Sequence, residues 1–121
     1  YHNLKLYPDN FYKYSIIGNN NSLASSGQYR IFSKIGISYG FVTETAYIVD
    51  FKKKKDYIFS ISMYVNQDEI INDGVYEYEK IARPFIANLS RIIQDNLSHS
   101  SNKITPYTDA YFNEIKVIIE P

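Results

Sequence analysis

Lys34 and Gly36 are the residues of this sequence whose types and spacing best suit a chemical task. They lie two positions apart in the run 31–40, which is rich in β-branched and aromatic residues and predicts a strand. Side chains alternate along a strand, so both are expected on one face. A cation beside an open backbone edge suits an anionic, extended, peptide-like ligand. An ordinary edge strand with an exposed lysine is the alternative interpretation.

Other patterns for catalysis or metal binding are weak. The two histidines, His2 and His99, lie at opposite ends of the chain and are predicted to be surface residues. The absence of cysteine excludes disulfides, thiolate catalysis and cysteine-bound zinc. The loop 66–74 is rich in oxygen donors, but Ile70 and Ile71 stand where a calcium loop needs ligands and a glycine. No phosphate loop, dinucleotide fingerprint or Gly-x-Ser-x-Gly elbow is present, so we expect no metal and no cofactor.

Composition describes a globular chain without a preference for polyanions. The 121 residues fit a single domain, and 45% hydrophobic and 17% aromatic residues suffice for a packed core. The formal net charge is zero, so neither nucleic acid nor a membrane surface is an expected partner. No run approaches the roughly 20 apolar residues of a membrane span. The sequence opens with Tyr1, without Met or a signal-peptide pattern, so we expect its natural start to lie upstream.

The order of elements predicts an α+β fold. Residues 9–17 predict a short helix, and the Asn, Ser and Gly residues of 19–27 predict a surface loop. Three β-rich runs follow, 29–38, 41–51 and 56–66, and their short connections permit only an antiparallel meander.

The second half of the chain predicts a hairpin turn and one long helix. The lysines Lys52 to Lys55 fit a solvated turn better than a polyanion site. Apolar residues then recur at helical spacing: Tyr78, Ile81, Ala82, Phe85, Leu89, Ile92, Ile93 and Leu97. Pro84 inside this pattern predicts a helix that begins late or bends in its first turns. Residues 98–121 form a tail in which 114–120 is a possible last strand.

A family resemblance rests on the same elements. A strand that closes on Lys-x-Gly, a short turn, two further strands and a long helix is how class A β-lactamases end, and Lys34 and Gly36 match their Lys-Thr-Gly box. The segments Lys-Ile-Gly, Tyr-Gly, Ala-Tyr-Ile-Val-Asp, Tyr-Val-Asn and Tyr-Glu-Tyr-Glu resemble the β-lactamase-related serine hydrolases common in Bacteroidetes. The similarity covers residues 11–97 and implies a single partial domain, the carboxy-terminal portion of a periplasmic or secreted serine hydrolase.

The resemblance implies roles for four residues. Lys34, Ile35, Gly36 and Ser38 would border the site of a small or peptide-like acidic substrate, with Lys34 docking its carboxylate. Ile35 replaces the hydroxyl residue of the box, and Ser38 would compensate only through a shift in strand register. The family's Ser-x-x-Lys and Ser-Asp-Asn motifs precede this strand and are not found there. No catalytic residue is therefore expected in this chain, which alone should be inactive and should pair with the rest of its domain.

Two sequence features resemble catalytic motifs, and two other functions remain open. Ser100 to Lys103 spell Ser-x-x-Lys, but they lie in a polar linker where nothing would desolvate the lysine, so we interpret the match as coincidence. Tyr64 to Asn66 match the Tyr-x-Asn of related transpeptidases, but they end a predicted core strand, so we interpret Tyr64 as structural. A non-catalytic α+β module that binds a peptide or glycan at its sheet edge, or an assembly part that pairs through that edge, are the alternative functions.

Overall fold

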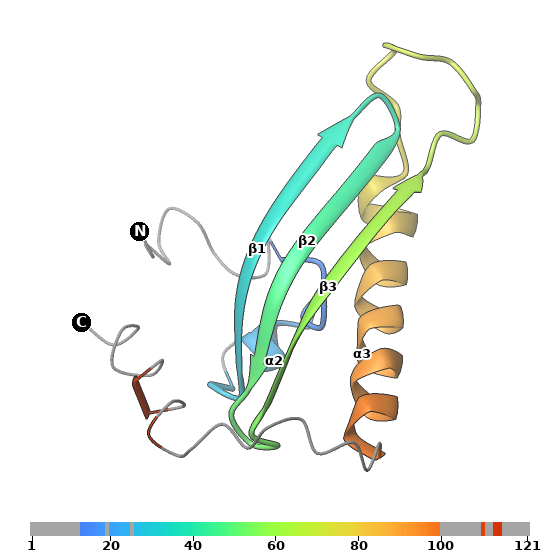
Figure 1. The fold of residues 1–121 in the computed structure, drawn as a ribbon. Coiled ribbons are helices and arrows are strands. Elements are labelled where there is room, and N and C mark those ends of the chain that lie inside the picture. The colour runs from blue at the N-terminus through green and yellow to red at the C-terminus, as the bar shows by residue number, and fades with distance from the viewer. Residues whose placement is uncertain (1–12, 19, 25, 100–109, 111–112, 115–121) are drawn as a thin grey trace.

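In the described part of the chain, a three-stranded antiparallel sheet has one long helix along a single face (Figure 1). This computed structural model describes residues 13–18, 20–24, 26–99, 110 and 113–114. The elements are α2 (Asn21–Ala24), β1 (Tyr29–Ser38), β2 (Phe41–Asp50), β3 (Lys55–Tyr64), the π-helix η1 (Tyr78–Ala82) and α3 (Arg83–His99). The predicted α+β meander is confirmed, with strand order β1-β2-β3.

Tight turns set the register of the sheet. Tyr39 and Gly40 join β1 to β2 with φ angles of 48° and 85°, the two positive values of the hairpin turn that matches strand twist. Glycine is required at position 40 for a second reason, because a Cβ there would lie 2.8 Å from the Cβ of Asn66. Both ladders run without a bulge, from Tyr29 opposite Asp50 at one end of the β1–β2 ladder to Ser38 opposite Phe41 at the other.

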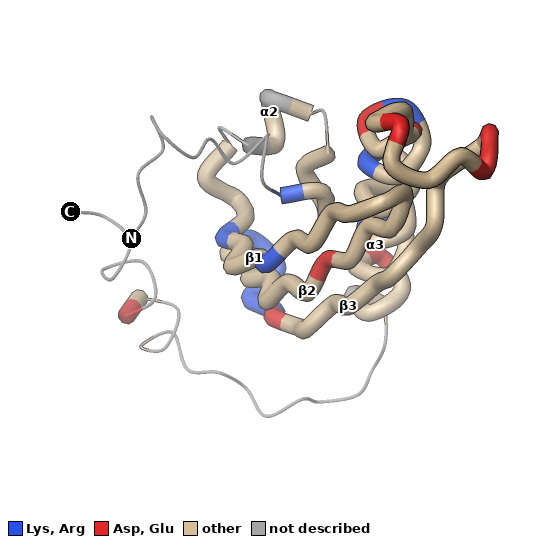
Figure 2. Tube along the Cα trace, turned by 90° about the horizontal axis from the view of Figure 1, so that it is seen from above, with Lys and Arg blue, Asp and Glu red and all other residues tan. Residues whose placement is uncertain are grey.

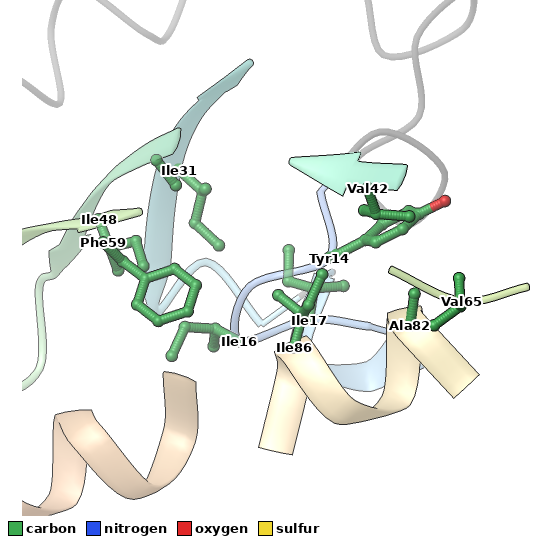
Figure 3. Packing of buried hydrophobic residues seen from close by; sticks show 11 residues of the cluster. Tyr14, Ile16, Ile17, Ile31, Val42, Ile48, Phe59, Val65, Ala82 and Ile86 are labelled. Carbon is green, nitrogen blue, oxygen red and sulfur yellow. The ribbon is translucent and has the colours of Figure 1, made fainter. Parts of the chain in front are cut away.

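The two faces of the sheet have different environments. On β2, Val42, Glu44, Ala46 and Ile48 are all fully buried toward α3, and the alternate residues of the first half of the strand are exposed. A hydrophobic cluster fills the space between this inner face and the helix (Figure 3). Its buried members are Tyr14, Ile16, Ile17, Ile31, Val42, Ala46, Ile48, Phe59, Val65, Ala82 and Ile86.

Residues 13–18 form a buried turn, not a helix. The predicted helix 9–17 is therefore wrong for its described part, and residues 9–12 lie outside the described residues. Ile16 has a φ of 61°, which a helix does not allow and which is rare for a β-branched residue. Its N–H donates to Ser90 Oγ at 2.6 Å, and its carbonyl accepts from Arg91 Nε at 2.7 Å. Contacts with α3 thus replace the bonds within a helix.

The predicted loop 19–27 contains one helical turn, α2. The side-chain oxygen of Asn20 accepts the N–H of Leu23 at 3.1 Å, the bond that a helix N-cap makes. An isolated turn of four residues was not expected from a segment so poor in apolar residues.

The long helix begins as the position of Pro84 predicts. The chain starts with the wider turns of η1 and becomes α-helical at Arg83, one residue before the proline that lacks an N–H. Not all of the predicted apolar positions face the core, because Ile81, Phe85 and Ile92 are exposed. Buried Ser90 and Gln94 take part in the core-facing surface instead. Of the possible last strand, only Glu114 is described, and it is helical.

Candidate functional site

Strand β1 lies at one edge of the sheet. Within the described part of the chain its neighbour is β2, and no strand pairs with its other side. Lys34 lies opposite Thr45 and Gly36 opposite Thr43, both of which are exposed on the outer face of the sheet. The lysine and the glycine therefore share the face that points away from α3. The structure places the two residues as their spacing predicted, on an edge strand.

Ile35 belongs to the other face of β1. It lies opposite the fully buried Glu44, and its partly buried side chain packs against the hydrophobic cluster. Ile35, which stands where the Lys-Thr-Gly box of class A β-lactamases has a hydroxyl residue, thus has a packing role. The four predicted site residues are divided by the pleat: Lys34, Gly36 and Ser38 lie on the outer face and Ile35 on the inner.

Ser38 is not brought next to Ile35. The β1–β2 ladder has no shift in register, so Ser38 stays four residues from Lys34, about 13 Å along the strand. Ser38 was expected to compensate for the hydroxyl that Ile35 lacks only if the strand register shifted, and the register does not shift. Ser38 is exposed at the end of β1, directly before the turn.

Gly36 accommodates a neighbour within the sheet. A Cβ at this position would lie 2.7 Å from Thr43 Oγ1, and that hydroxyl donates to the Gly36 carbonyl at 3.4 Å. The close approach of Thr43 is sufficient reason for glycine here. Gly36 nevertheless leaves the backbone of β1 uncovered on the outer face, because it has no side chain.

Two aromatic rings lie beside Lys34 on the outer face, toward the start of β1. Phe32 stacks against Tyr47 with a centroid distance of 6.1 Å, and the Arg30 guanidinium lies 5.4 Å from the centre of the Phe32 ring. Tyr47 donates to Asp56 Oδ2 across the sheet at 2.5 Å. The sequence reasoning missed this group, although the alternation of Arg30, Phe32 and Lys34 places all three on one face of a strand.

Lys34 has no charge partner among the residues that the structure describes. Among the described residues, none forms a hydrogen bond or ion pair with Lys34, and the side chain is exposed. Arg30 adds a second positive charge two positions before Phe32 on the same face. This strip of β1 is therefore cationic and aromatic, a surface that attracts an anionic group.

The inner face carries a buried carboxylate that the sequence did not reveal. Glu44 has no exposed surface and accepts three hydrogen bonds: from the Ser15 N–H at 2.9 Å, from Ser15 Oγ at 2.7 Å and from Ser33 Oγ at 2.7 Å. Together they join β1, β2 and the buried turn 13–18. Alternation along β2 places position 44 among buried apolar residues, which is the signal that could have identified it.

A second buried polar group lies where β2 connects to β3, at the turn that carries Lys52 to Lys54. Asp50 is buried and accepts the backbone N–H groups of Lys52 and Lys53 at 2.9 and 3.0 Å and the side-chain amide of Gln94 at 2.5 Å. Nearby, burial raises the pKa of the Tyr57 phenol well above its ordinary value, and Tyr29, Asp50 and Asp95 add to the rise. No described residue is a hydrogen-bond partner of the buried Tyr57 hydroxyl.

The four lysines lie at the β2–β3 connection, as predicted. Lys52 to Lys54 are in the turn and Lys55 is the first residue of β3. Lys53 pairs with Asp95 at 3.2 Å, and Lys55 Nζ donates to the Leu97 carbonyl at 2.8 Å, near the end of α3. Both contacts fasten the hairpin to the helix, where a cation is favourable. A structural role accounts for these two lysines.

The remaining candidates that the structure describes are His99 and Tyr64. His99 is exposed at the end of α3, and its ring nitrogen contacts the Asp95 carbonyl at 2.7 Å; His2 and the segment 100–103 lie outside the described residues. Tyr64 is exposed at the end of β3 and packs against Phe41. Over the residues that the structure describes, no three metal-binding side chains come together.

Comparison with known proteins leaves the family open. In the described residues, no helix is long and apolar enough to cross a membrane. No protein-family model, no curated protein and no solved structure matches this chain.

Proposed function

We propose that this chain supplies the Lys-x-Gly edge strand of a serine hydrolase of the class A β-lactamase type. The observation that carries the proposal is the position of Lys34, exposed without a described partner on the outer face of an edge strand. The resemblance assigns this strand to the wall of an active site. An edge strand in the described part of the chain is consistent with that assignment, whereas a central strand would oppose it.

The proposed chemistry is acyl transfer. A serine hydroxyl from the remainder of the domain attacks a carbonyl carbon, its proton passes to a base, and an alcohol or amine leaves. Water then hydrolyses the acyl-enzyme and restores the serine. The nucleophile and its base are not in this chain. Lys34 would dock an acidic group of the substrate, and the free edge of β1 would pair with an extended substrate backbone.

The position of Ile35 narrows the proposed substrate contacts. Position 35 is an isoleucine whose side chain faces the core. The substrate carboxylate would therefore be held by the Lys34 ammonium without a hydroxyl at position 35. Loss of a hydrogen bond to a charged group lowers binding by about 1.5–3 kcal/mol. The proposed enzyme therefore differs in its acidic subsite from one with a Lys-Thr-Gly box, and an ester, amide or peptide with a weaker requirement for that hydroxyl is the proposed substrate class.

The first test is to sequence the gene upstream of the codon for Tyr1. The proposal expects an open reading frame that encodes Ser-x-x-Lys and then Ser-Asp-Asn before Lys34. An open reading frame without these motifs contradicts the hydrolase assignment.

The second test labels the full gene product with a fluorophosphonate. We expect the parent protein to acylate and this chain to remain unlabelled. Replacing Lys34 by Ala in the parent should leave labelling by the uncharged reagent in place and weaken turnover of acidic substrates. The matched control is Lys52→Ala, on an exposed turn at the far end of the sheet. Equal effects of the two changes would contradict a docking role for Lys34.

A non-catalytic binding module is the second candidate, and the outer face of the sheet favours it. Phe32 and Tyr47 stack beside two cations, and Phe41 packs on Tyr64 at 4.7 Å farther along the same face. Exposed aromatic rings of this kind bind peptides and glycans. Binding of such a ligand by this chain alone, without acylation of the full gene product, would support the module in place of the enzyme.

A further inference from the structure

The loop between β3 and η1 is apolar and acidic on its exposed surface. Its residues 65–77 include Asp68, Glu69, Asp73 and Glu77 but neither lysine nor arginine. Three aliphatic side chains of the loop are more than half exposed: Ile70 at 57%, Ile71 at 65% and Val75 at 58%. Figure 2 shows the acidic loop projecting from one end of the molecule, away from the basic turn between β2 and β3. We call residues 65–77 the acidic loop.

Side chains of the acidic loop hold its backbone in place. Asp68 accepts the N–H of Ile70 at 3.0 Å, and Asp73 accepts the N–H of Val75 at 2.9 Å. The Tyr76 hydroxyl accepts the N–H of Asn72 at 2.8 Å. Because these contacts fix the backbone that carries Ile70 and Val75, a ligand would bind a preformed surface and lose little conformational entropy on the protein side.

The apolar surface continues from the loop onto the sheet. The Asn66 side-chain amide donates both to the Ile70 carbonyl at 3.1 Å and to the Tyr64 hydroxyl at 3.0 Å, which brings the loop against the end of β3. Tyr64 packs on Phe41, and both rings are exposed. Aliphatic and aromatic side chains that gather at one end of a molecule are typical of an interaction surface.

We infer that the acidic loop docks a polypeptide segment that combines aliphatic side chains with lysine or arginine. The aliphatic side chains of the loop supply the apolar contact, and its four carboxylates select a basic partner by charge complementarity. This inference is independent of the proposed hydrolase function, because the loop needs neither a nucleophile nor Lys34.

Two other occupants fit the surface less well. A second copy could offer its Lys52 to Lys55 turn, where Lys53 and Lys55 already contact α3, or the strip of β1 that carries Arg30 and Lys34. Either contact joins two different surfaces of the molecule, whereas the commonest dimers pair the same patch on both copies. An anionic lipid surface would be repelled by the four carboxylates. A basic polypeptide is the occupant that the charge of the loop favours.

The test uses three synthetic peptides and the 121-residue chain. One peptide carries lysine and leucine at helical spacing, the second has glutamate for every lysine, and the third has serine for every leucine. Fluorescence anisotropy measures the Kd of each. We expect the lysine–leucine peptide to bind at least about tenfold more tightly than either of the others, and to weaken as salt screens the charges.

Matched variants separate the two contributions. Replacing Ile70, Ile71 and Val75 together by Ser should weaken binding about tenfold, and Ile92→Ser, an equally exposed position on α3, should not. Asp68→Asn with Asp73→Asn removes two charges but keeps the oxygen that each turn bond uses, so binding should weaken and lose part of its salt dependence. Circular dichroism confirms that each variant is folded.

Three results would overturn the inference. The first is equal binding of the lysine and glutamate peptides, and the second is unchanged binding by the triple Ser variant. The third is self-association of the chain in sedimentation that the triple Ser variant abolishes, which would assign the surface to a second copy.

Discussion

The two faces of β1 and β2 are built from neighbouring residues and yet have opposite roles. Position 44 is fully buried and holds a carboxylate that binds three donors, while position 45 is exposed and holds a threonine that contacts Ser60. On β1, buried Ile31 is followed by Phe32, which is 46% exposed. Since the pleat alone assigns each residue to a face, a shift of one residue would exchange the two roles.

This comparison separates stability from recognition. The inner face joins the sheet to the turn 13–18 and to α3, so changes there should affect folding. The outer face carries the exposed side chains of Phe32 and Lys34, so changes there should leave folding nearly unchanged and affect the proposed binding. Substitutions of adjacent residues test this division, because each pair shares its strand and its backbone environment.

The largest effect is expected for Glu44→Leu. The change leaves the Ser15 N–H and the hydroxyls of Ser15 and Ser33 without their acceptor in a buried site. Each of the three groups that loses its partner costs about 1–3 kcal/mol, so the free energy of unfolding should fall by about 3–9 kcal/mol. Thr45→Val, on the outer face, should change it by less than about 0.5 kcal/mol. Urea denaturation measures both, and a similar loss for the two variants would contradict the division.

A smaller effect is expected when Ile31 is changed to Ala. Truncation of a buried isoleucine removes apolar contacts and leaves a cavity, at a cost of about 2–5 kcal/mol. Phe32→Ala removes a larger side chain, but one that is nearly half exposed, and should cost under about 1 kcal/mol. Thermal unfolding of the two variants under one set of conditions gives the order; a greater loss for the Phe32 variant would reverse our assignment of faces.

Tyr57→Phe should be neutral or stabilising by up to about 1 kcal/mol, although the residue lies on the inner face. The change removes a buried hydroxyl for which no described residue is a partner, and it keeps the ring in the core. A loss above about 1 kcal/mol, measured by urea denaturation at neutral pH, would show that the hydroxyl is bonded in solution.

The same variant should change the dependence of stability on pH. Burial raises the pKa of Tyr57 in the folded chain above its ordinary value of 10.0, so the neutral phenol is favoured in the native state. The associated stability is fully present below about pH 10 and is lost as the pH rises further. The Phe variant should lose less stability than the unchanged chain between neutral pH and pH values above 10. Identical curves would contradict a raised pKa.

Lys34→Ala should have the smallest effect on folding, within about 0.5 kcal/mol, because the side chain is exposed and has no described partner. A loss of stability comparable to that of the Ile31 variant would assign Lys34 a structural role. The measurement is the same thermal unfolding experiment, and it complements the binding tests described for this residue above.

Much of the fold could be predicted because its signals are local. β-branched runs with short connections predict the meander, and apolar residues at helical spacing predict the helix. Pro84 indicates where the first turns of the helix depart from regular α-helical geometry. Strand alternation also placed Lys34 and Gly36 on one face. The turn 13–18 could not be predicted, since its backbone groups bond to Glu44, Ser90 and Arg91, which are distant in sequence. The exposure of Ile81, Phe85 and Ile92 likewise depends on where α3 meets the sheet.

The sequence by itself determined the strands, their antiparallel order and which of their side chains share a face, because side-chain period and turn length are properties of neighbouring residues. Tertiary structure alone decided which face of the sheet meets α3, so that Ile35 faces the core, and it alone brought the donors Ser15 and Ser33 to Glu44. These outcomes follow from which segments pack together. Packing joins residues far apart along the chain, and local patterns carry no information about such contacts.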